Sequence, residues 1–227
     1  MLGLSSQISK PRERVKRHKI LLADDHAIVR DGLRLMLQKD FEIVGAVEDG
    51  RALVKEAKRL APDVVIMDIS MPMLNGVEAT RQLRQSLPRT KVVVLTMHGD
   101  VTYATEALEA GASGYVLKNS PSEEIKTAIR KVLAGKTYVS PGIAQEVLPF
   151  RLTGSNQIKR QVSQLTPRQR EVVQLLAEGR TGKDVADLLC ISPRTVEFHK
   201  YKLMQELGLQ SSAELIRYAM KHGIISP

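Results

Sequence analysis

Three aspartates stand directly after short apolar runs, at positions where the strands of a sheet would end. Asp24 and Asp25 follow residues 20–23, and Asp68 follows residues 64–67. Ligands of an open parallel sheet bind outside the carboxyl ends of its strands, so these carboxylates converge if the two strands are neighbours. Clustered carboxylates repel each other unless a cation lies between them, and an all-oxygen site on loops suits Mg²⁺. We therefore expect a magnesium site, against the alternative of three solvated aspartates that cap loops and helices.

Two further residues, Thr96 and Lys118, end later apolar runs and would join the same rim. A carboxylate beside Mg²⁺ and a lysine is arranged to accept a phosphoryl group, because the metal and the ammonium neutralise the oxygens of the transition state. The product of such a transfer would be an aspartyl phosphate.

The elements that would position these residues alternate between strand and helix patterns. Five apolar runs predict strands, several of them apolar on both faces, as a buried parallel sheet requires. The runs are residues 20–23, 43–47, 64–67, 92–95 and 115–117. The helical patterns between them imply right-handed crossovers, with helices on both faces of the sheet. The fold predicted for this part is a five-stranded, doubly wound parallel α/β domain.

The rest of the chain is predicted to be a linker followed by an all-α domain. Residues 137–163 lack sustained periodicity and form the predicted linker, with a short helix expected around residues 143–148. Four helix starts follow, at Thr166, Thr181, Ser192 and Ser211. The second and third of these helices flank a tight turn at residues 190–192. This is the helix-turn-helix spacing, in which the helix after the turn, here from residue 193 onward, enters the major groove of DNA.

The helix after this turn has two faces of different character. Val196, Leu203 and Leu207 form one stripe that is suited to the core. Four residues lie on another face: Arg194, Glu197, Phe198 and Tyr201. An exposed phenylalanine is unusual for a merely solvated face. The periodicity is equally compatible with a Phe198 that packs inward.

Composition and charge narrow the class of protein. The 227 residues are 43% hydrophobic, with no apolar run near the roughly 18 residues that a membrane span needs. The basic N-terminus lacks the apolar region of a secretory signal, and a single cysteine, Cys190, fits a reducing cytoplasm. The net charge of +9 is uneven: residues 1–19 hold six Lys/Arg against one Glu, residues 20–136 sixteen of each sign, and residues 137–227 twelve against eight. Basic ends on a neutral body favour a polyanionic partner.

Four separated motifs resemble the receiver domain of two-component response regulators. They are residues 21–26, residues 67–72 with Asn75 and Gly76, residues 94–96 and residues 110–118. The resemblance implies that Asp68 is the phosphoacceptor and that Asp24, Asp25, Asp68 and the backbone carbonyl of Ser70 hold Mg²⁺. It also implies that Lys118 and Thr96 contact the phosphoryl group, with Thr96 and Tyr115 as a switch pair. Physically, new phosphoryl oxygens would draw the Thr96 hydroxyl inward and vacate space for the Tyr115 ring.

The C-terminal segments 165–172, 176–179, 185–186, 191–199 and 207–208 resemble the LuxR-type helix-turn-helix. The whole chain thus resembles a response regulator of the NarL/FixJ family. Its implied organisation is a basic tail (1–18), a flavodoxin-like receiver (19–136), a linker (137–163) and a four-helix DNA-binding domain (164–227). The residues implied to contact DNA are Lys183, Arg194, Thr195, Glu197, Phe198, His199, Lys200, Tyr201 and Lys202.

The implied function is a cytoplasmic transcription regulator that takes a phosphoryl group from a sensor histidine kinase. Its implied partners are that kinase, promoter DNA and RNA polymerase, with a homodimer on activation, no membrane contact, and no enzymatic turnover of a separate substrate. One alternative is a phosphatase with Asp68 as nucleophile. Such phosphatases carry a second aspartate two residues on, where this chain has Ser70. The other alternative is an interaction module whose helical domain binds protein instead of DNA.

Overall fold

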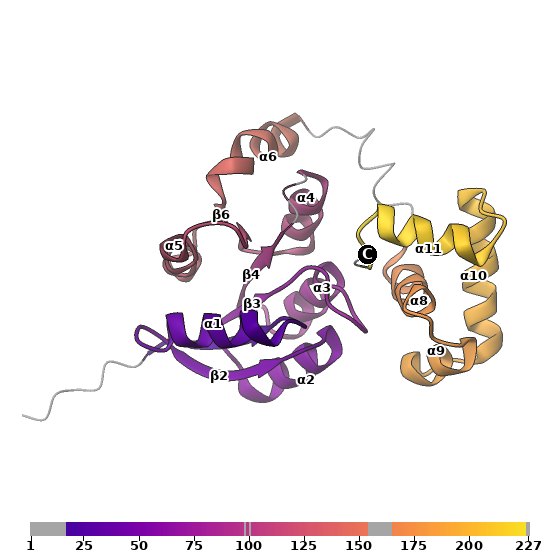
Figure 1. The fold of residues 1–227 in the computed structure, drawn as a ribbon, viewed down its shortest axis with the longest axis horizontal. Helices are drawn as coiled ribbons and strands as arrows, with labels where there is room; N and C mark the ends of the chain where they lie inside the picture. The colour runs from indigo at the N-terminus through magenta and orange to yellow at the C-terminus, as the bar shows by residue number, and fades with distance from the viewer. Residues whose placement is uncertain (1–16, 98, 100, 154–164, 226–227) are drawn as a thin grey trace, which may run out of the picture.

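The computed structural model describes residues 17–97, 99, 101–153 and 165–225. Most of the basic tail and the last part of the expected linker therefore lie outside the described residues. The described chain forms a parallel sheet with helices on both faces, followed by a separate cluster of helices (Figure 1).

Within the described residues, six parallel strands make one sheet in the order β2-β1-β3-β4-β5-β6. Their bounds are β1 Lys19–Ala23, β2 Glu42–Val47, β3 Val64–Met67, β4 Lys91–Thr96, β5 Gly114–Leu117 and β6 Tyr138–Val139. The five predicted strands are all present, and β6 is an additional two-residue strand. The strand order changes direction between β1 and β3, which is the topological switch point where such sheets bind ligands.

Helices cover both faces of this sheet. Those of the receiver are α1 Ala27–Leu37, α2 Gly50–Leu60, α3 Gly76–Ser86, α4 Val101–Ala110, α5 Ser122–Leu133 and α6 Pro141–Thr153. Buried residues of α1 and α5 pack on one face, and buried residues of α2, α3, α4 and α6 pack on the other. The strands are buried from both sides, which explains their nearly continuous apolar sequences.

The stretch from 138 to 153 contains the helix expected around residues 143–148, but it packs on the receiver, which a free linker would not do. Its residues form β6, which pairs with β5, and α6, which packs against α4. Ile143 and Val147 lie one helical turn apart and are 4% and 1% exposed in the core cluster that also contains Tyr115. The receiver fold therefore extends past residue 136, because this short apolar pair completes one face of the sheet.

The C-terminal domain has the four helices that the sequence predicts. They are α8 Pro167–Ala177, α9 Gly182–Leu189, α10 Pro193–Leu207 and α11 Ser212–Lys221. Each begins after a Ser or Thr whose side chain accepts a hydrogen bond from the backbone of the first turn. The turn between α9 and α10 places Cys190 in the left-handed region, at φ 51°.

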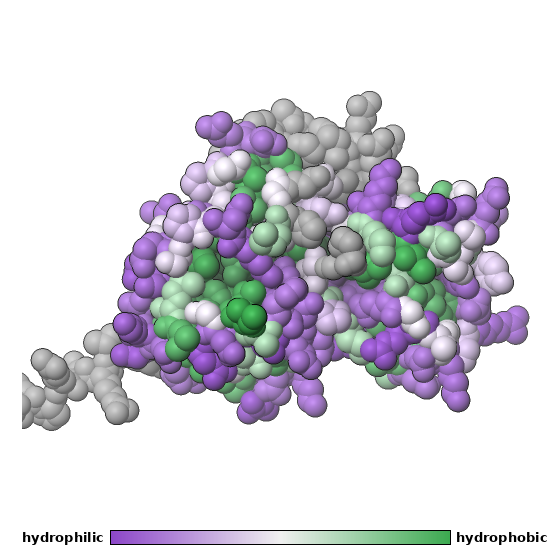
Figure 2. Space-filling model, in the orientation of Figure 1, coloured by the Kyte–Doolittle hydropathy of each residue, from purple (hydrophilic) through white to green (hydrophobic). Residues whose placement is uncertain are grey.

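Exposed apolar side chains gather on one helix of the receiver. Ile28 and Leu35 of α1 are 88% and 66% exposed, and green surface collects over this helix in Figure 2. Figure 2 also shows green surface on the helical domain at the right, between hydrophilic side chains. No helix among the described residues is both long and apolar enough to cross a membrane.

Candidate functional site

The acidic site lies at the carboxyl ends of β1 and β3, as expected. These strands pair in parallel with Ala23 opposite Met67, so the residues that follow them emerge at the same level. The Asp68 backbone N–H donates to the Ala23 carbonyl at 2.9 Å and ties the two strand ends together. Asp24 and Asp68 are 1% and 6% exposed, whereas Asp25 is exposed. The three aspartates thus converge on one partly buried rim.

A close backbone approach holds the loop after Asp68 in place. Asn75 caps α3 by accepting from the Glu78 backbone N–H, and Gly76 donates its own N–H to the Ile69 carbonyl. A Cβ atom at Gly76 would lie 2.6 Å from the Asp68 carbonyl oxygen, closer than real Cβ atoms come. Glycine at this position therefore lets α3 start against the strand end that carries Asp68.

Lys118 reaches this rim from the end of β5. Its Nζ lies 2.7 Å from Asp24 Oδ2 and 2.9 Å from Asp68 Oδ2. Burial acts to lower the pKa of Lys118, but the hydrogen bonds that its ammonium donates to Asp24 and Asp68 outweigh burial, so the pKa is raised above its usual value. The lysine is therefore a fixed positive charge between two buried carboxylates, where it can also meet a phosphoryl oxygen.

His26 is a site residue that the sequence reasoning missed. Its Nδ1 lies 2.8 Å from Asp25 Oδ1 and 3.3 Å from Asp24 Oδ1. One ligand atom from each of Asp24, Asp25, His26 and Asp68 can be chosen so that all lie within 4.8 Å of one another, which is the spacing of a metal-binding cluster. The available signal was an imidazole directly after the Asp24–Asp25 pair.

The two expected switch residues are buried on one face of the sheet. Tyr115 pairs with Val94 across β4 and β5, and Thr96 lies two residues further along the same strand as Val94. Alternate residues of a strand share a face, so Thr96 and Tyr115 are diagonal neighbours. Both are 0% exposed, so the structure holds the tyrosine ring in the inward position.

On α10 the two faces separate as the stripe of Val196, Leu203 and Leu207 predicts. Val196 and Leu203 are 0% and 1% exposed, while Phe198 and Tyr201 are 60% and 67% exposed. The alternative of an inward Phe198 is thereby excluded. Its ring lies edge-on to the half-buried His199 at 5.9 Å between centroids.

The remaining expected DNA contacts surround these aromatic residues. Lys183, Arg194 and Lys202 are exposed, whereas Thr195, Glu197 and Lys200 are half-buried. The Thr195 backbone N–H donates to Ser192 Oγ and so belongs to the cap of α10. The face combines exposed aromatic rings with peripheral cations, which suits contacts with base edges and phosphates.

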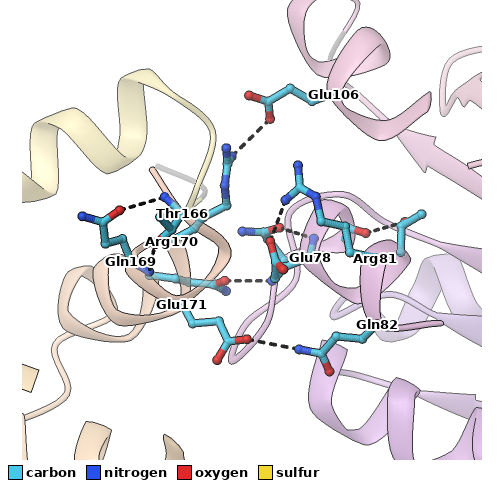
Figure 3. Close-up of polar contacts among 12 residues, drawn as sticks. Glu78, Arg81, Gln82, Glu106, Thr166, Gln169, Arg170 and Glu171 are labelled. Atoms are coloured by element: carbon cyan, nitrogen blue, oxygen red, sulfur yellow. Dashed lines mark hydrogen bonds and ion pairs between the residues drawn. The ribbon is translucent and has the colours of Figure 1, made fainter. Parts of the chain in front are cut away.

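The helical domain docks on the receiver through contacts of α8 with α3 and α4 (Figure 3). The buried Gln174 of α8 donates to the Met71 carbonyl at 2.9 Å and accepts from the Asn75 N–H at 2.8 Å. Arg170 pairs with Glu106 of α4 at 3.1 Å, a contact seen at the top of Figure 3. The loop between β3 and α3 therefore forms part of both the acidic site and the domain interface.

Comparisons with known proteins agree with this architecture. Residues 20–130 match the family model of the response regulator receiver domain, and residues 163–219 match that of the bacterial regulatory proteins of the luxR family. The chain is 39% identical over 214 residues to the oxygen regulatory protein NreC of Staphylococcus aureus strain MRSA252, covering 91% of this chain and 99% of NreC.

Two solved structures match this chain across both domains. The response regulator RcsB of Salmonella typhimurium matches with a TM-score of 0.63 at 26% identity, over 92% of this chain and 99% of that one. A structure of the RcsB–DNA complex matches with a TM-score of 0.55 at 26% identity, over 89% and 97%.

The fold and the two domains define a two-component response regulator with a receiver and a LuxR-type DNA-binding domain. The chain belongs to the NarL/FixJ family of these transcription regulators. Its receiver accordingly carries an acidic site for a divalent metal ion, made by the cluster around Asp24, Asp25 and Asp68.

Proposed function

We propose that this protein is a phosphorylation-dependent transcription regulator in which Asp68 accepts a phosphoryl group from a sensor histidine kinase. The observation that carries the proposal is the convergence of Asp68 with Asp24, Asp25 and Lys118 on one rim. An Asp68 oxygen would attack the phosphorus of the donor's phosphohistidine, the P–N bond would break, and the histidine would keep its bonding electron pair.

The metal in this proposal is Mg²⁺, because carboxylate and carbonyl oxygens are the ligands that it prefers. Asp24, Asp25, Asp68 and the Ser70 carbonyl would hold it. When bound, it neutralises charge on the transferring phosphoryl group. Lys118 supplies a second positive charge beside Asp68, where the ion pairs already described hold it.

The modified Asp68 would act through the switch pair. New phosphoryl oxygens would accept a hydrogen bond from Thr96 and so favour the arrangement in which Tyr115 is inward. This fits the placement of the two side chains on one face at adjacent strand ends. The loop from Ser70 to Asn75 would pass the change on to α8, which it contacts through Gln174.

The output would be binding to promoter DNA through α10, as a homodimer that contacts RNA polymerase. The exposed Phe198 and Tyr201 and the DNA-bound structure of RcsB support this part of the proposal. A further solved structure, described as two RcsB dimers bound to two parallel DNAs, is 26% identical to this chain and supports binding as a dimer. Two half-sites bound by a dimer would give the affinity that one short helix lacks.

We further propose that the protein works in the cytoplasm and has no separate substrate. Ser70 occupies the position where a phosphatase of this chemistry carries a second acid, so no side chain there can protonate a leaving group. Sustained release of phosphate from an added ester would contradict this assignment. The exposed Ile28 and Leu35 of α1, the helix that begins after the acidic rim, offer an apolar surface for a protein phosphodonor.

The test compares Asp68→Asn with the wild type and with Asp31→Asn, a control on the exposed side of α1. Acetyl phosphate with Mg²⁺ should label the wild type and the control but not Asp68→Asn. In gel shifts on genomic fragments, treatment with acetyl phosphate should increase DNA binding by the wild type and the control but not by Asp68→Asn. An unlabelled Asp68→Asn whose DNA binding still responds to acetyl phosphate would contradict the proposed coupling, and no gel shift at all would favour the interaction module.

A further inference from the structure

His26 adds a nitrogen donor to a site that otherwise offers only oxygen. It is the residue before the first turn of α1, and its side chain makes no capping hydrogen bond with that helix. The imidazole is 67% exposed and turns toward Asp24 and Asp25. Helix capping therefore does not explain its position, whereas proximity to the two carboxylates does.

The distances match those between two ligands of one metal ion. Bonds from zinc to nitrogen or oxygen are about 2.0–2.2 Å long, so neighbouring ligand atoms on one ion lie about 2.8–3.6 Å apart. His26 Nδ1 lies 2.8 Å from Asp25 Oδ1 and 3.3 Å from Asp24 Oδ1. A divalent ion placed between these groups would need little movement of the side chains.

We propose that His26 is a ligand of the acidic site and makes it bind first-row transition ions, with Zn²⁺ as the probe, more tightly than three carboxylates alone would. Imidazole suits zinc, nickel and copper, whereas Mg²⁺ takes oxygen ligands and keeps several waters. His26 therefore adds much to the affinity for Zn²⁺ and little to that for Mg²⁺. This inference rests on the proposed metal binding at Asp68.

The biological consequence is competition between two classes of ion at one site. A transition ion held by His26 and Asp25 would take ligands that Mg²⁺ needs for phosphoryl transfer. Phosphorylation of Asp68 in the presence of Mg²⁺ would then be inhibited by free Zn²⁺. The sensitivity would depend on the side chain at position 26.

The experiment is isothermal titration calorimetry of the full chain with Zn²⁺, with and without saturating Mg²⁺, and with Mg²⁺ alone. His26→Gln keeps a polar side chain but removes the imidazole. His18→Gln is the matched control, because His18 also lies beside an aspartate, at 3.5 Å from Asp63, away from the acidic site. At the site from which Mg²⁺ displaces Zn²⁺, we expect His26→Gln to lower the affinity for Zn²⁺ by about tenfold or more. The affinity for Mg²⁺ should change by less than about threefold.

Three results would overturn the inference. They are equal Zn²⁺ affinity in wild type and His26→Gln, an equal loss in His18→Gln, and Zn²⁺ binding that Mg²⁺ does not displace. If Mg²⁺ binds normally in any of these cases, the proposed function stands and only the role of His26 fails. If Mg²⁺ binds to no variant, the proposed metal site fails, and this inference fails with it.

Discussion

Lys118 carries a charge that the two buried carboxylates beside it require. Its pKa is raised because its hydrogen bonds with Asp24 and Asp68 outweigh the opposing effect of burial. A lysine with a raised pKa contributes stability that is fully present below its ordinary pKa and is lost as the pH rises through the raised one. At neutral pH the ammonium is therefore protonated and holds the site together before any metal binds.

Replacing Lys118 by methionine should destabilise the metal-free protein, because it leaves Asp24 and Asp68 buried without their partner. We expect a loss of about 3 kcal/mol in the free energy of unfolding, measured with urea in the absence of divalent ions. Added Mg²⁺ should recover more stability in this variant than in the wild type, since the ion takes the place of the ammonium.

Lys126→Met serves as the control, because Lys126 pairs with Glu123 at the surface of α5. It should change the stability little, with or without Mg²⁺. A Lys118→Met protein as stable as the wild type in metal-free buffer would show that the ion pairs do not stabilise the site.

The sequence predicts this site unevenly. Asp24, Asp25 and Asp68 are recognisable because they follow apolar runs, and the carboxyl ends of parallel strands meet at one edge. His26 lies within the motif of residues 21–26, but the sequence does not mark it as a ligand, because its role depends on how a loop turns its side chain. Gln174 could not be predicted at all, since its partners lie about a hundred positions earlier in the chain.

Among the helices, α8 shows most directly how local sequence fixes a boundary. The Thr166 hydroxyl accepts from the Gln169 backbone N–H at 3.2 Å, and the Gln169 side chain accepts from the Thr166 N–H at 2.8 Å. This reciprocal capping satisfies two backbone donors that a helix start leaves free. Pro167 at the first helical position reinforces the same boundary.

Thr166→Ala should therefore destabilise the helical domain by about 1 kcal/mol. Thermal unfolding followed by circular dichroism measures the effect. The matched control is Thr127→Ala, an exposed position inside α5 whose hydroxyl bonds the Glu123 carbonyl one turn back. Alanine is a better helix former there, so no loss is expected. Equal losses in both variants would argue against the role of the cap.

The segment from 138 to 153 is only partly predictable: a short helix is expected around residues 143–148, but β6 and the full length of α6 are not. Two residues of β6 are too short to give an alternating pattern, and proline and glycine at the start of α6 are typical of a loop. The role of Ile143 and Val147 cannot be predicted locally, because it depends on their burial in the core beside the folded sheet. Such a segment is defined largely by tertiary packing.

In the whole molecule, docking of the helical domain leaves the recognition helix uncovered. The domain meets the receiver through α8, Leu188 of α9 and the stretch after α11, whereas α10 lies on the side away from the receiver in Figure 1. Phe198 and Tyr201 are exposed in this docked state. The receiver does not act as a steric cap on these two side chains.

Breaking the interface should accordingly change the shape of the molecule without changing its contact with a single half-site. Gln174→Ala would leave the Met71 carbonyl and the Asn75 N–H without partners when docked, which disfavours docking by about 1–3 kcal/mol. Small-angle scattering should detect a more extended molecule. Fluorescence anisotropy with a short, labelled, random-sequence duplex should give the same affinity as the wild type.

Gln85→Ala, at an exposed position of α3, is the control for both measurements. An affinity that rises well above the wild type in Gln174→Ala, but not in Gln85→Ala, would mean that docking does hide the DNA-binding surface. Unchanged scattering would instead show that Gln174 contributes little to the interface.

The turn before the recognition helix also carries the protein's single cysteine. Cys190 is exposed, and it is held in a left-handed backbone conformation between α9 and α10. A maleimide dye would therefore attach to the natural sequence at one defined point, next to the helix proposed to enter the major groove. The fluorescence of such a dye would report DNA binding near α10 without any substitution in the protein.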